Sequence, residues 1–283
     1  MIFSEQDVFG AGETVISSWS AGTGPTGILV LSDFGAPAVC WRDFSESLAA
    51  DFRIVGFHYR GTYGSSRPLN ESQTSVDDHV ADAMAVLDHH RMSAPIVVGW
   101  STGAPVAFRL AATYPDRVRA LLAVAGVPRA SDSAGRLVEL LSGTLISGAA
   151  KVARLMPNPL RSLINKAPVD SATANFLQRS GLLSAEVDKE LLTQVIAGYL
   201  EQDPNWYLRL VAGEARSKSS DSGPLSCPVR ILAGRSDILI PAPLALQAAQ
   251  RIPDATLEMV PGSHFLPLER PTVVADTLRE IAS

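Results

Sequence analysis

Short apolar runs alternate with amphipathic segments along the first 126 residues of the chain. The apolar runs are rich in β-branched residues, which is typical of buried strands. We predict strands at 27–31, 52–57 and 118–126, and a further strand from Ile96. Residues 41–50 and 75–90 instead repeat apolar positions with helical spacing, and Ser75 is placed to cap the second helix. This alternation predicts a mostly parallel sheet flanked by helices on both faces.

The alternation stops between residues 127 and 225. Helical patterns replace it there, separated by prolines at positions 157, 159, 168 and 204, and residues 214–224 have the composition of an exposed linker. Strands then follow at 228–234 and 255–260, and helices at 242–252 and 271–282. We therefore expect one α/β core, built from residues 1–126 and 226–283, with a helical insertion at 127–225.

Composition narrows the classes of function. With 283 residues, of which 46% are apolar, the chain can bury a sizeable core. The net charge of −5, the pI of about 5.6 and the lack of a Lys/Arg cluster argue against a nucleic-acid partner. No apolar run approaches the roughly 18 residues that a membrane span needs. The N-terminus also lacks a basic-then-apolar signal, so we expect a cytoplasmic protein without a membrane span.

The cysteine and glycine patterns indicate neither a metal nor a cofactor. Cys40 and Cys227 lie far apart, and no Cys-x-x-Cys or His/Cys cluster accompanies them. We expect two reduced thiols in a reducing compartment, while a single disulfide between them stays open. The glycines at 56–64 are not a dinucleotide fingerprint, because no helix follows at the required offset.

Ser101 lies between two glycines in the stretch Gly-Trp-Ser-Thr-Gly, after an apolar run and before a helical pattern. A tight strand-to-helix turn is what the nucleophile-elbow motif requires, and it would hold the Ser101 hydroxyl above the sheet. The N–H of Thr102, at the start of the helix, would point at the same place, where the helix dipole favours negative charge. The sequence therefore predicts a nucleophilic serine.

A serine nucleophile needs a base, and the base needs an acid that orients it. In an open α/β sheet these side chains belong on loops at the carboxyl ends of strands. Asp237 and His264 follow two successive predicted strands, and Asp132, which lies beyond an earlier strand, is an alternative to Asp237. The histidines that we expect to be solvated on the helix at 75–90 are His79, His89 and His90.

The sequence resembles the α/β-hydrolase fold superfamily, in particular serine esterases with the chain order Ser, Asp, His and a helical cap. The resemblance spans nearly the whole chain outside the insertion and rests on "GWSTG", "AGRSDILIP" and "GSHFLPLERP". It implies an α/β-hydrolase fold in which Ser101 is the nucleophile, His264 the base and acid, and Asp237 the orienting carboxylate. The inserted helices would cover the pocket as a cap.

Two loops depart from the family's pattern. The resemblance implies an oxyanion hole made by the backbone N–H groups of Phe34 and Thr102, but Ser-Asp stands at 32–33 where the family usually has His-Gly. His58 stands where related enzymes commonly carry an aspartate. A lone carboxylate at Asp33 would oppose a developing oxyanion. We therefore expect Asp33 and His58 to pair, which would raise the pKa of His58.

These observations predict a serine hydrolase that cleaves a carboxylic ester, or a related acyl compound, through an acyl-enzyme intermediate. The expected partner is a small acyl substrate of mostly apolar character. Two alternatives stay open. The resemblance admits C–C bond hydrolysis or acyl transfer on the same fold, and the unusual Asp33 admits a ligand-binding protein with vestigial hydrolysis.

Overall fold

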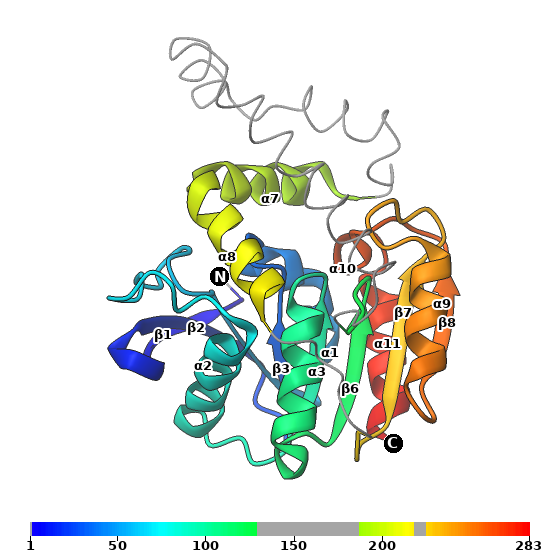
Figure 1. The fold of residues 1–283 in the computed structure, drawn as a ribbon. Coiled ribbons are helices and arrows are strands. Elements are labelled where there is room, and N and C mark those ends of the chain that lie inside the picture. Colours follow the sequence, from blue (N-terminus) through cyan, green and yellow to red (C-terminus); the bar gives the residue numbers. More distant parts are fainter. Residues whose placement is uncertain (1, 129–186, 218–224) are drawn as a thin grey trace.

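A single eight-stranded sheet forms the centre of the molecule (Figure 1). The computed structural model describes residues 2–128, 187–217 and 225–283. The strand order is β1-β2-β4-β3-β5-β6-β7-β8, with β2 antiparallel to β1 and to β4 and all other neighbours parallel. The predicted mostly parallel sheet is thus confirmed. The strands are β1 (Ser4–Phe9), β2 (Val15–Ala21), β3 (Thr26–Leu31), β4 (Phe52–Phe57), β5 (Ile96–Trp100), β6 (Ala120–Val124), β7 (Val229–Gly234) and β8 (Thr256–Val260).

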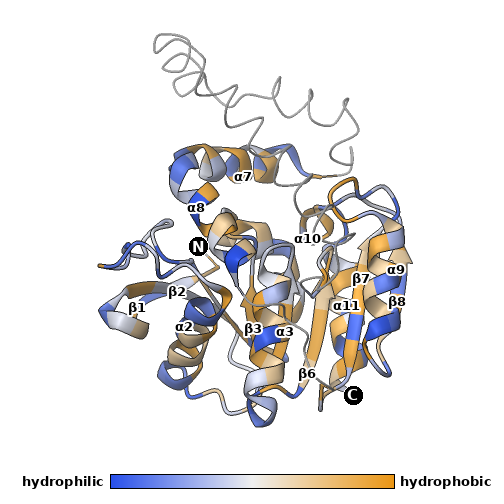
Figure 2. Ribbon diagram, viewed as in Figure 1, coloured by the Kyte–Doolittle hydropathy of each residue, from blue (hydrophilic) through white to orange (hydrophobic). Residues whose placement is uncertain are grey.

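Helices cover both faces of this sheet, as predicted. One face carries α2 (Val76–His89), α3 (Gly103–Thr113) and α9 (Ala242–Arg251), and the other carries α1 (Arg42–Leu48) and α11 (Pro271–Ala282). Figure 2 shows central strands that are largely hydrophobic between helices of mixed character. The short helices in the loops are η1 (Ala11–Glu13), η2 (Ala38–Trp41), η3 (Pro115–Arg117) and α10 (Leu266–Glu269).

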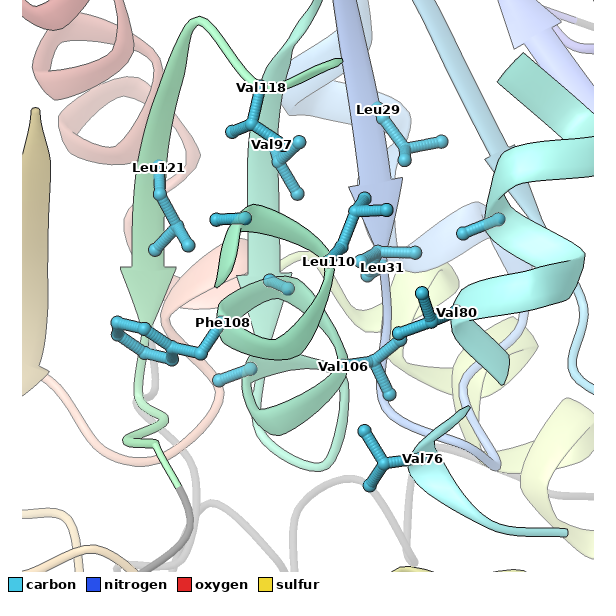
Figure 3. Close-up of a cluster of buried hydrophobic side chains, with 14 of the residues drawn as sticks. Leu29, Leu31, Val76, Val80, Val97, Val106, Phe108, Leu110, Val118 and Leu121 are labelled. Atoms are coloured by element: carbon cyan, nitrogen blue, oxygen red, sulfur yellow. The ribbon is translucent and has the colours of Figure 1, made fainter. Parts of the chain in front are cut away.

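Successive residues of the central strands serve two separate cores. Leu29 and Leu31 of β3 pack in the cluster that contains α2 and α3, whereas Ile28 and Val30 pack in the cluster on the opposite face. Figure 3 shows the first cluster, with side chains of β3, β5 and β6 around Val106 and other residues of α3. Burial of each such aliphatic side chain stabilises the folded state by about 1.5–3 kcal/mol relative to leaving it exposed. Burial on both faces explains why these strands are uniformly apolar in sequence.

The first two strands, β1 and β2, are missing from the sequence-based prediction. Their sequences, SEQDVF and VISSWSA, contain many polar residues, and β1 forms an edge of the sheet. The Ser18 hydroxyl donates to the Gln6 carbonyl at 2.9 Å, and the Ser17 N–H donates to the Ser65 hydroxyl at 2.9 Å. Polar contacts of this kind carry no hydrophobic periodicity, which is why the pattern gave no signal.

Other boundaries agree closely with the sequence. Ser75 caps α2 as predicted: its hydroxyl accepts the Asp78 N–H at 3.2 Å, and the Asp78 carboxylate accepts the Ser75 N–H at 2.9 Å. The predicted strand at 118–126 is shorter, Ala120–Val124. The predicted linker at 214–224 begins too early, because its first residues belong to the last turn of the helix that ends at Arg216.

Two helices of the insertion are described, α7 (Lys189–Glu201) and α8 (Pro204–Arg216), and both are helical as expected. They lie beyond one end of the sheet (Figure 1). Leu192 and Trp206 are buried, and the Trp206 indole N–H donates to the Arg60 carbonyl at 2.5 Å. Residues 129–186 and 218–224 lie outside the described residues, so the division into core and cap stays a prediction. The apolar residues of the predicted insertion that fall there include Leu140, Leu141, Leu155 and Phe176.

Within the described ranges, no helix is long and apolar enough to cross a membrane. In the same part of the chain, no group of three or more His, Cys, Asp or Glu side chains could hold a metal ion. Cys40 is buried and Cys227 half-buried, and both are free thiols.

Candidate active site

Ser101 occupies a strained turn between β5 and α3. Its φ is 55°, a left-handed conformation that is rare for a residue with a side chain. Both flanking glycines are required by close packing. A Cβ on Gly99 would lie 2.8 Å from the Ala104 Cα, and one on Gly103 would lie 2.0 Å from the Leu31 carbonyl oxygen. The chain therefore has the strand–turn–helix context that the Gly-x-Ser-x-Gly motif requires.

His264 and Asp237 converge on this serine. His264 Nε2 lies 2.7 Å from Ser101 Oγ, and His264 Nδ1 lies 2.9 Å from Asp237 Oδ2. Asp237 follows β7 and His264 follows β8, so the carboxyl ends of neighbouring parallel strands deliver both side chains. Both are buried, at 6% and 5% exposure. The alternative acid, Asp132, lies outside the described residues.

Backbone N–H groups hold the carboxylate of Asp237 in place. Its Oδ1 accepts from the N–H groups of Leu239 and Ile240, each at 2.8 Å, which leaves Oδ2 directed at His264. This arrangement fixes the orientation of the ring and places a basic nitrogen on the Ser101 hydroxyl. Chemically, it is suited to deprotonate Ser101 as its oxygen attacks an electrophile.

Two further contacts position the histidine loop. The Trp100 indole N–H donates to the His264 carbonyl at 3.0 Å, although Trp100 itself is fully buried. The Glu269 carboxylate accepts from the Ser263 N–H at 2.6 Å and from the Ser263 hydroxyl at 2.8 Å. Neither Trp100 nor Glu269 was expected from the sequence to contribute to the site. The adjacency of Trp100 to Ser101 was the available signal.

The two expected oxyanion donors lie in neighbouring loops, but one of them is engaged. The Phe34 N–H donates to the Thr102 hydroxyl at 2.9 Å, and that hydroxyl donates to Asp33 Oδ2 at 3.0 Å. Among the hydrogen bonds of the described residues, none uses the Thr102 N–H. The structure thus brings Phe34 and Thr102 together, with the Thr102 side chain on the Phe34 donor.

Asp33 has four hydrogen-bond donors around it. Its Oδ1 accepts from the Gly35 N–H at 3.0 Å and from the Tyr199 hydroxyl of α7 at 3.3 Å. Its Oδ2 accepts from Thr102 and from the Tyr207 hydroxyl of α8 at 3.5 Å. Burial, and next the negative charge of Asp33, raise the pKa of both tyrosines well above the usual value, which keeps them protonated donors.

The expected pairing of Asp33 with His58 is wrong. His58 is buried and stacks on Tyr63 at a ring-centroid distance of 4.4 Å, and no ion pair joins it to Asp33 within the described part of the chain. Burial lowers the pKa of His58 to about 4, opposite to the expected rise. The substitutions in these two loops do not compensate each other electrostatically.

His79 is a second correction. We expected it to be solvated, but it is fully buried, and its ring packs 5.1 Å from that of Phe34 and 4.9 Å from that of Tyr59. Burial, and next the charge of Arg60, lower its pKa to about 3. His79 lies on the apolar side of α2, which a period count could have revealed, because it is three residues after Val76. His89 is exposed, as expected.

Comparisons with known proteins agree with this architecture. The candidate carbamate hydrolase RutD of Caulobacter sp. (strain K31) is 25% identical over 247 residues, which cover 86% of this chain and 85% of that protein. An esterase from Exiguobacterium antarcticum has a TM-score of 0.77 at 14% identity, covering 99% of this chain and 100% of its own. A thermophilic esterase from Thermogutta terrifontis has a TM-score of 0.71 at 21% identity, covering 98% and 97%. The sequence profile described as alpha/beta hydrolase fold matches residues 28–271, and the chain therefore belongs to that family.

Proposed function

We propose that this alpha/beta hydrolase is a serine hydrolase that cleaves a carboxylic ester, or a related acyl compound, through an acyl-enzyme intermediate. The observation that carries the proposal is the continuous hydrogen-bonded series from Ser101 through His264 to Asp237, with distances of 2.7 and 2.9 Å. A nucleophile, a base and an orienting acid in this relation are what acyl transfer to a serine requires.

The chemical steps follow from the positions of these groups. Ser101 Oγ attacks the substrate carbonyl while His264 Nε2 takes the hydroxyl proton, and Asp237 stabilises the imidazolium that forms. His264 then gives the proton to the leaving alcohol, and the acyl group stays on Ser101. A water molecule, deprotonated by His264, attacks the acyl carbonyl, the bond to Ser101 Oγ breaks, and His264 returns the proton to Oγ as the carboxylic acid leaves.

The developing oxyanion would be held by the N–H of Thr102 and by the N–H of Phe34. For Phe34 to take part, its N–H must be shared with, or released from, the Thr102 hydroxyl that accepts it at 2.9 Å. Each such donor typically contributes a factor of about 10²–10³ to kcat. The N–H of Thr102 alone would therefore support slower turnover than the complete pair.

The insertion, residues 127–225, would act as a cap that covers a mostly apolar acyl pocket and excludes water. The buried contacts of α7 and α8 with the core support this role. The name of the RutD relatives adds carbamates to the acyl compounds that should be tested. C–C bond hydrolysis and acyl transfer to another acceptor use the same first step at Ser101 and remain the alternatives within this class.

A ligand-binding protein with vestigial hydrolysis is the second candidate, and one observation favours it. The Phe34 N–H is already satisfied by Thr102, which lowers its readiness to bind an oxyanion. Burst kinetics separate the two candidates, because an enzyme recycles whereas a vestigial site acylates once and stops.

The deciding experiment labels the protein with a fluorophosphonate probe and maps the modified residue. We expect the probe on Ser101, none on the Ser101→Ala variant, and competition by a panel of esters, carbamates and amides. Ser101→Ala should also lose about 10⁴-fold or more in turnover of the best competitor while its unfolding transition is unchanged. Retention of a tenth of the activity in that variant would exclude the mechanism.

A further inference from the structure

Asp33 is a buried carboxylate at the carboxyl end of β3, beside the nucleophile turn. Only 7% of its surface is exposed. Thr102, which directly follows Ser101, donates its hydroxyl to Asp33, and the tyrosine hydroxyls of α7 and α8 donate to the same carboxylate. The rings of Tyr199 and Tyr207 also pack closely against this loop, because a Cβ on Gly35 would lie 3.0 Å from each ring. Asp33 thus lies between the nucleophile turn and the cap helices.

The hydrogen bonds around Asp33 are those of an ionised carboxylate. An ionised carboxylate only accepts hydrogen bonds, and here each oxygen accepts two while Asp33 donates none. All four donors are neutral. The buried guanidinium of Arg60 pairs with Asp82, and burial keeps His58 neutral near pH 7. The negative charge of Asp33 is therefore dispersed over hydrogen bonds, and no cation cancels it within the described residues.

This charge lies close to the Phe34 N–H, the expected oxyanion donor beside which a scissile carbonyl would bind. Two hydrogen bonds in series, of 3.0 and 2.9 Å, join the Asp33 carboxylate to the Phe34 N–H through the Thr102 hydroxyl. The carboxylate is thus within about 6 Å of one expected oxyanion donor, a distance at which a second charge in a partly desolvated site changes rates by about tenfold or more. The Thr102 hydroxyl directs its hydrogen at Asp33, so its oxygen, which carries the partial negative charge, faces the Phe34 N–H.

We infer that Asp33 is a specificity-determining residue, which makes the site accept acyl groups that are neutral or cationic near the scissile carbonyl and reject acyl groups that carry a carboxylate there. The inference rests on the proposed function and names its substrate class. It concerns the ratio of rates between substrates. Asp33 also acts on the oxyanion and can position the loop. These two effects are the same for every substrate, so they cancel in the ratio of rates.

The test uses three p-nitrophenyl esters that differ in the charge of the acyl group. They are the mono-p-nitrophenyl ester of succinate, its neutral methyl ester, and the p-nitrophenyl ester of 4-(trimethylammonio)butanoate. For the wild-type protein at pH 7.5, we expect kcat/KM of the neutral ester to exceed that of the anionic ester by about tenfold or more. The cationic ester should be hydrolysed at least as well as the neutral one.

Asp33→Asn removes the charge and keeps the shape. The Asn carbonyl can still accept the Gly35 N–H, and the hydroxyl oxygens of Thr102 and Tyr207 can accept from the Asn amide, while their own hydrogens lose Asp33 Oδ2 as an acceptor. We expect the neutral-to-anionic ratio to fall about tenfold. The matched control is Asp116→Asn, which removes an exposed charge beyond the far end of α3 and should leave the ratio unchanged. Asp33→Ser replaces the Asn variant if the latter does not fold.

Each outcome bears on one claim. A wild-type protein that hydrolyses the anionic and neutral esters equally fast overturns the charge rule, and so does an unchanged ratio in Asp33→Asn with Ser101 still labelled by the fluorophosphonate. Equal changes in Asp33→Asn and Asp116→Asn reduce the effect to overall net charge and also overturn it. Failure to label Ser101, with no turnover of any ester, overturns the proposed function, and the charge rule falls with it.

Discussion

Burial of His79 should make the fold acid-sensitive well above the pH at which carboxylates titrate. In the folded protein the pKa of His79 is about 3, against 6.5 for an ordinary histidine, because the ring is buried beside Arg60. Below pH 6.5 the unfolded chain therefore binds a proton that the folded protein does not. The contribution of neutral His79 to the free energy of unfolding is therefore complete above pH 6.5 and decreases as the pH falls toward 3.

The size of the effect follows from the two pKa values. At pH 5 the pH lies about 1.5 below the pKa of His79 in the unfolded chain, whereas His79 in the folded protein is still unprotonated. Protonation of the unfolded chain therefore lowers the free energy of unfolding by about 2 kcal/mol. His79→Phe keeps the ring contacts with Phe34 and Tyr59 and removes two buried nitrogens that have no hydrogen-bond partner in the described structure. An unpaired buried polar group costs about 1–3 kcal/mol, so this variant should be the more stable protein even at pH 8.

Urea unfolding at pH 8, 7, 6 and 5 measures this prediction. The stability difference between His79→Phe and the wild type should grow by about 2 kcal/mol from pH 8 to pH 5, with unchanged m-values. His89→Gln, on the exposed side of the same helix, is the matched control and should leave the pH dependence of the wild type unaltered. A difference between His79→Phe and wild type that is the same at pH 8 and pH 5 would refute the reasoning.

Two further variants test the contacts that support the site. Trp100→Phe removes the N–H that holds the His264 carbonyl and should lower kcat about tenfold with little change in KM. Trp41→Phe, a buried tryptophan whose N–H contacts Ser32 instead, controls for lost packing, and an equal fall in kcat in both variants would count against a positioning role for Trp100. Asp82→Asn breaks the buried pair with Arg60 and should lower the free energy of unfolding by about 3–5 kcal/mol in urea melts, whereas the exposed Asp88→Asn should change it by less than about 1 kcal/mol.

Local patterns were sufficient to predict the central strands, the cap of α2 and the tight turn that carries Ser101. These features depend on short-range signals, such as apolar runs, capping residues and glycines at a turn that excludes a Cβ. The edge strand β1 gave no such signal, because its pairing with β2 uses polar residues that also suit a loop. Local patterns could not predict how separate loops meet across the fold.

Asp33 illustrates that limit. Charge complementarity in the sequence suggested His58 as its partner, but the donors that surround it come from Thr102 of the nucleophile turn and from Tyr199 and Tyr207 of the insertion. These contacts span up to 174 positions in the sequence and involve neutral hydroxyls, which no charge pattern identifies. Only the packing of α7 and α8 against the β3 loop brings them together.

The choice of an aspartate at this position is hard to explain by stability alone. Moving a carboxylate out of water costs several kcal/mol in a real protein, and each hydrogen bond to the charged group returns about 1.5–3 kcal/mol. Two of the four bonds to Asp33, at 3.3 and 3.5 Å, are long and return less than that. The gain and the cost are therefore of similar size, and a neutral side chain of similar shape would stabilise the loop about as well. The charge has its largest consequence in the field that it projects toward the scissile carbonyl, and selection among substrates is the effect that only a charge can supply.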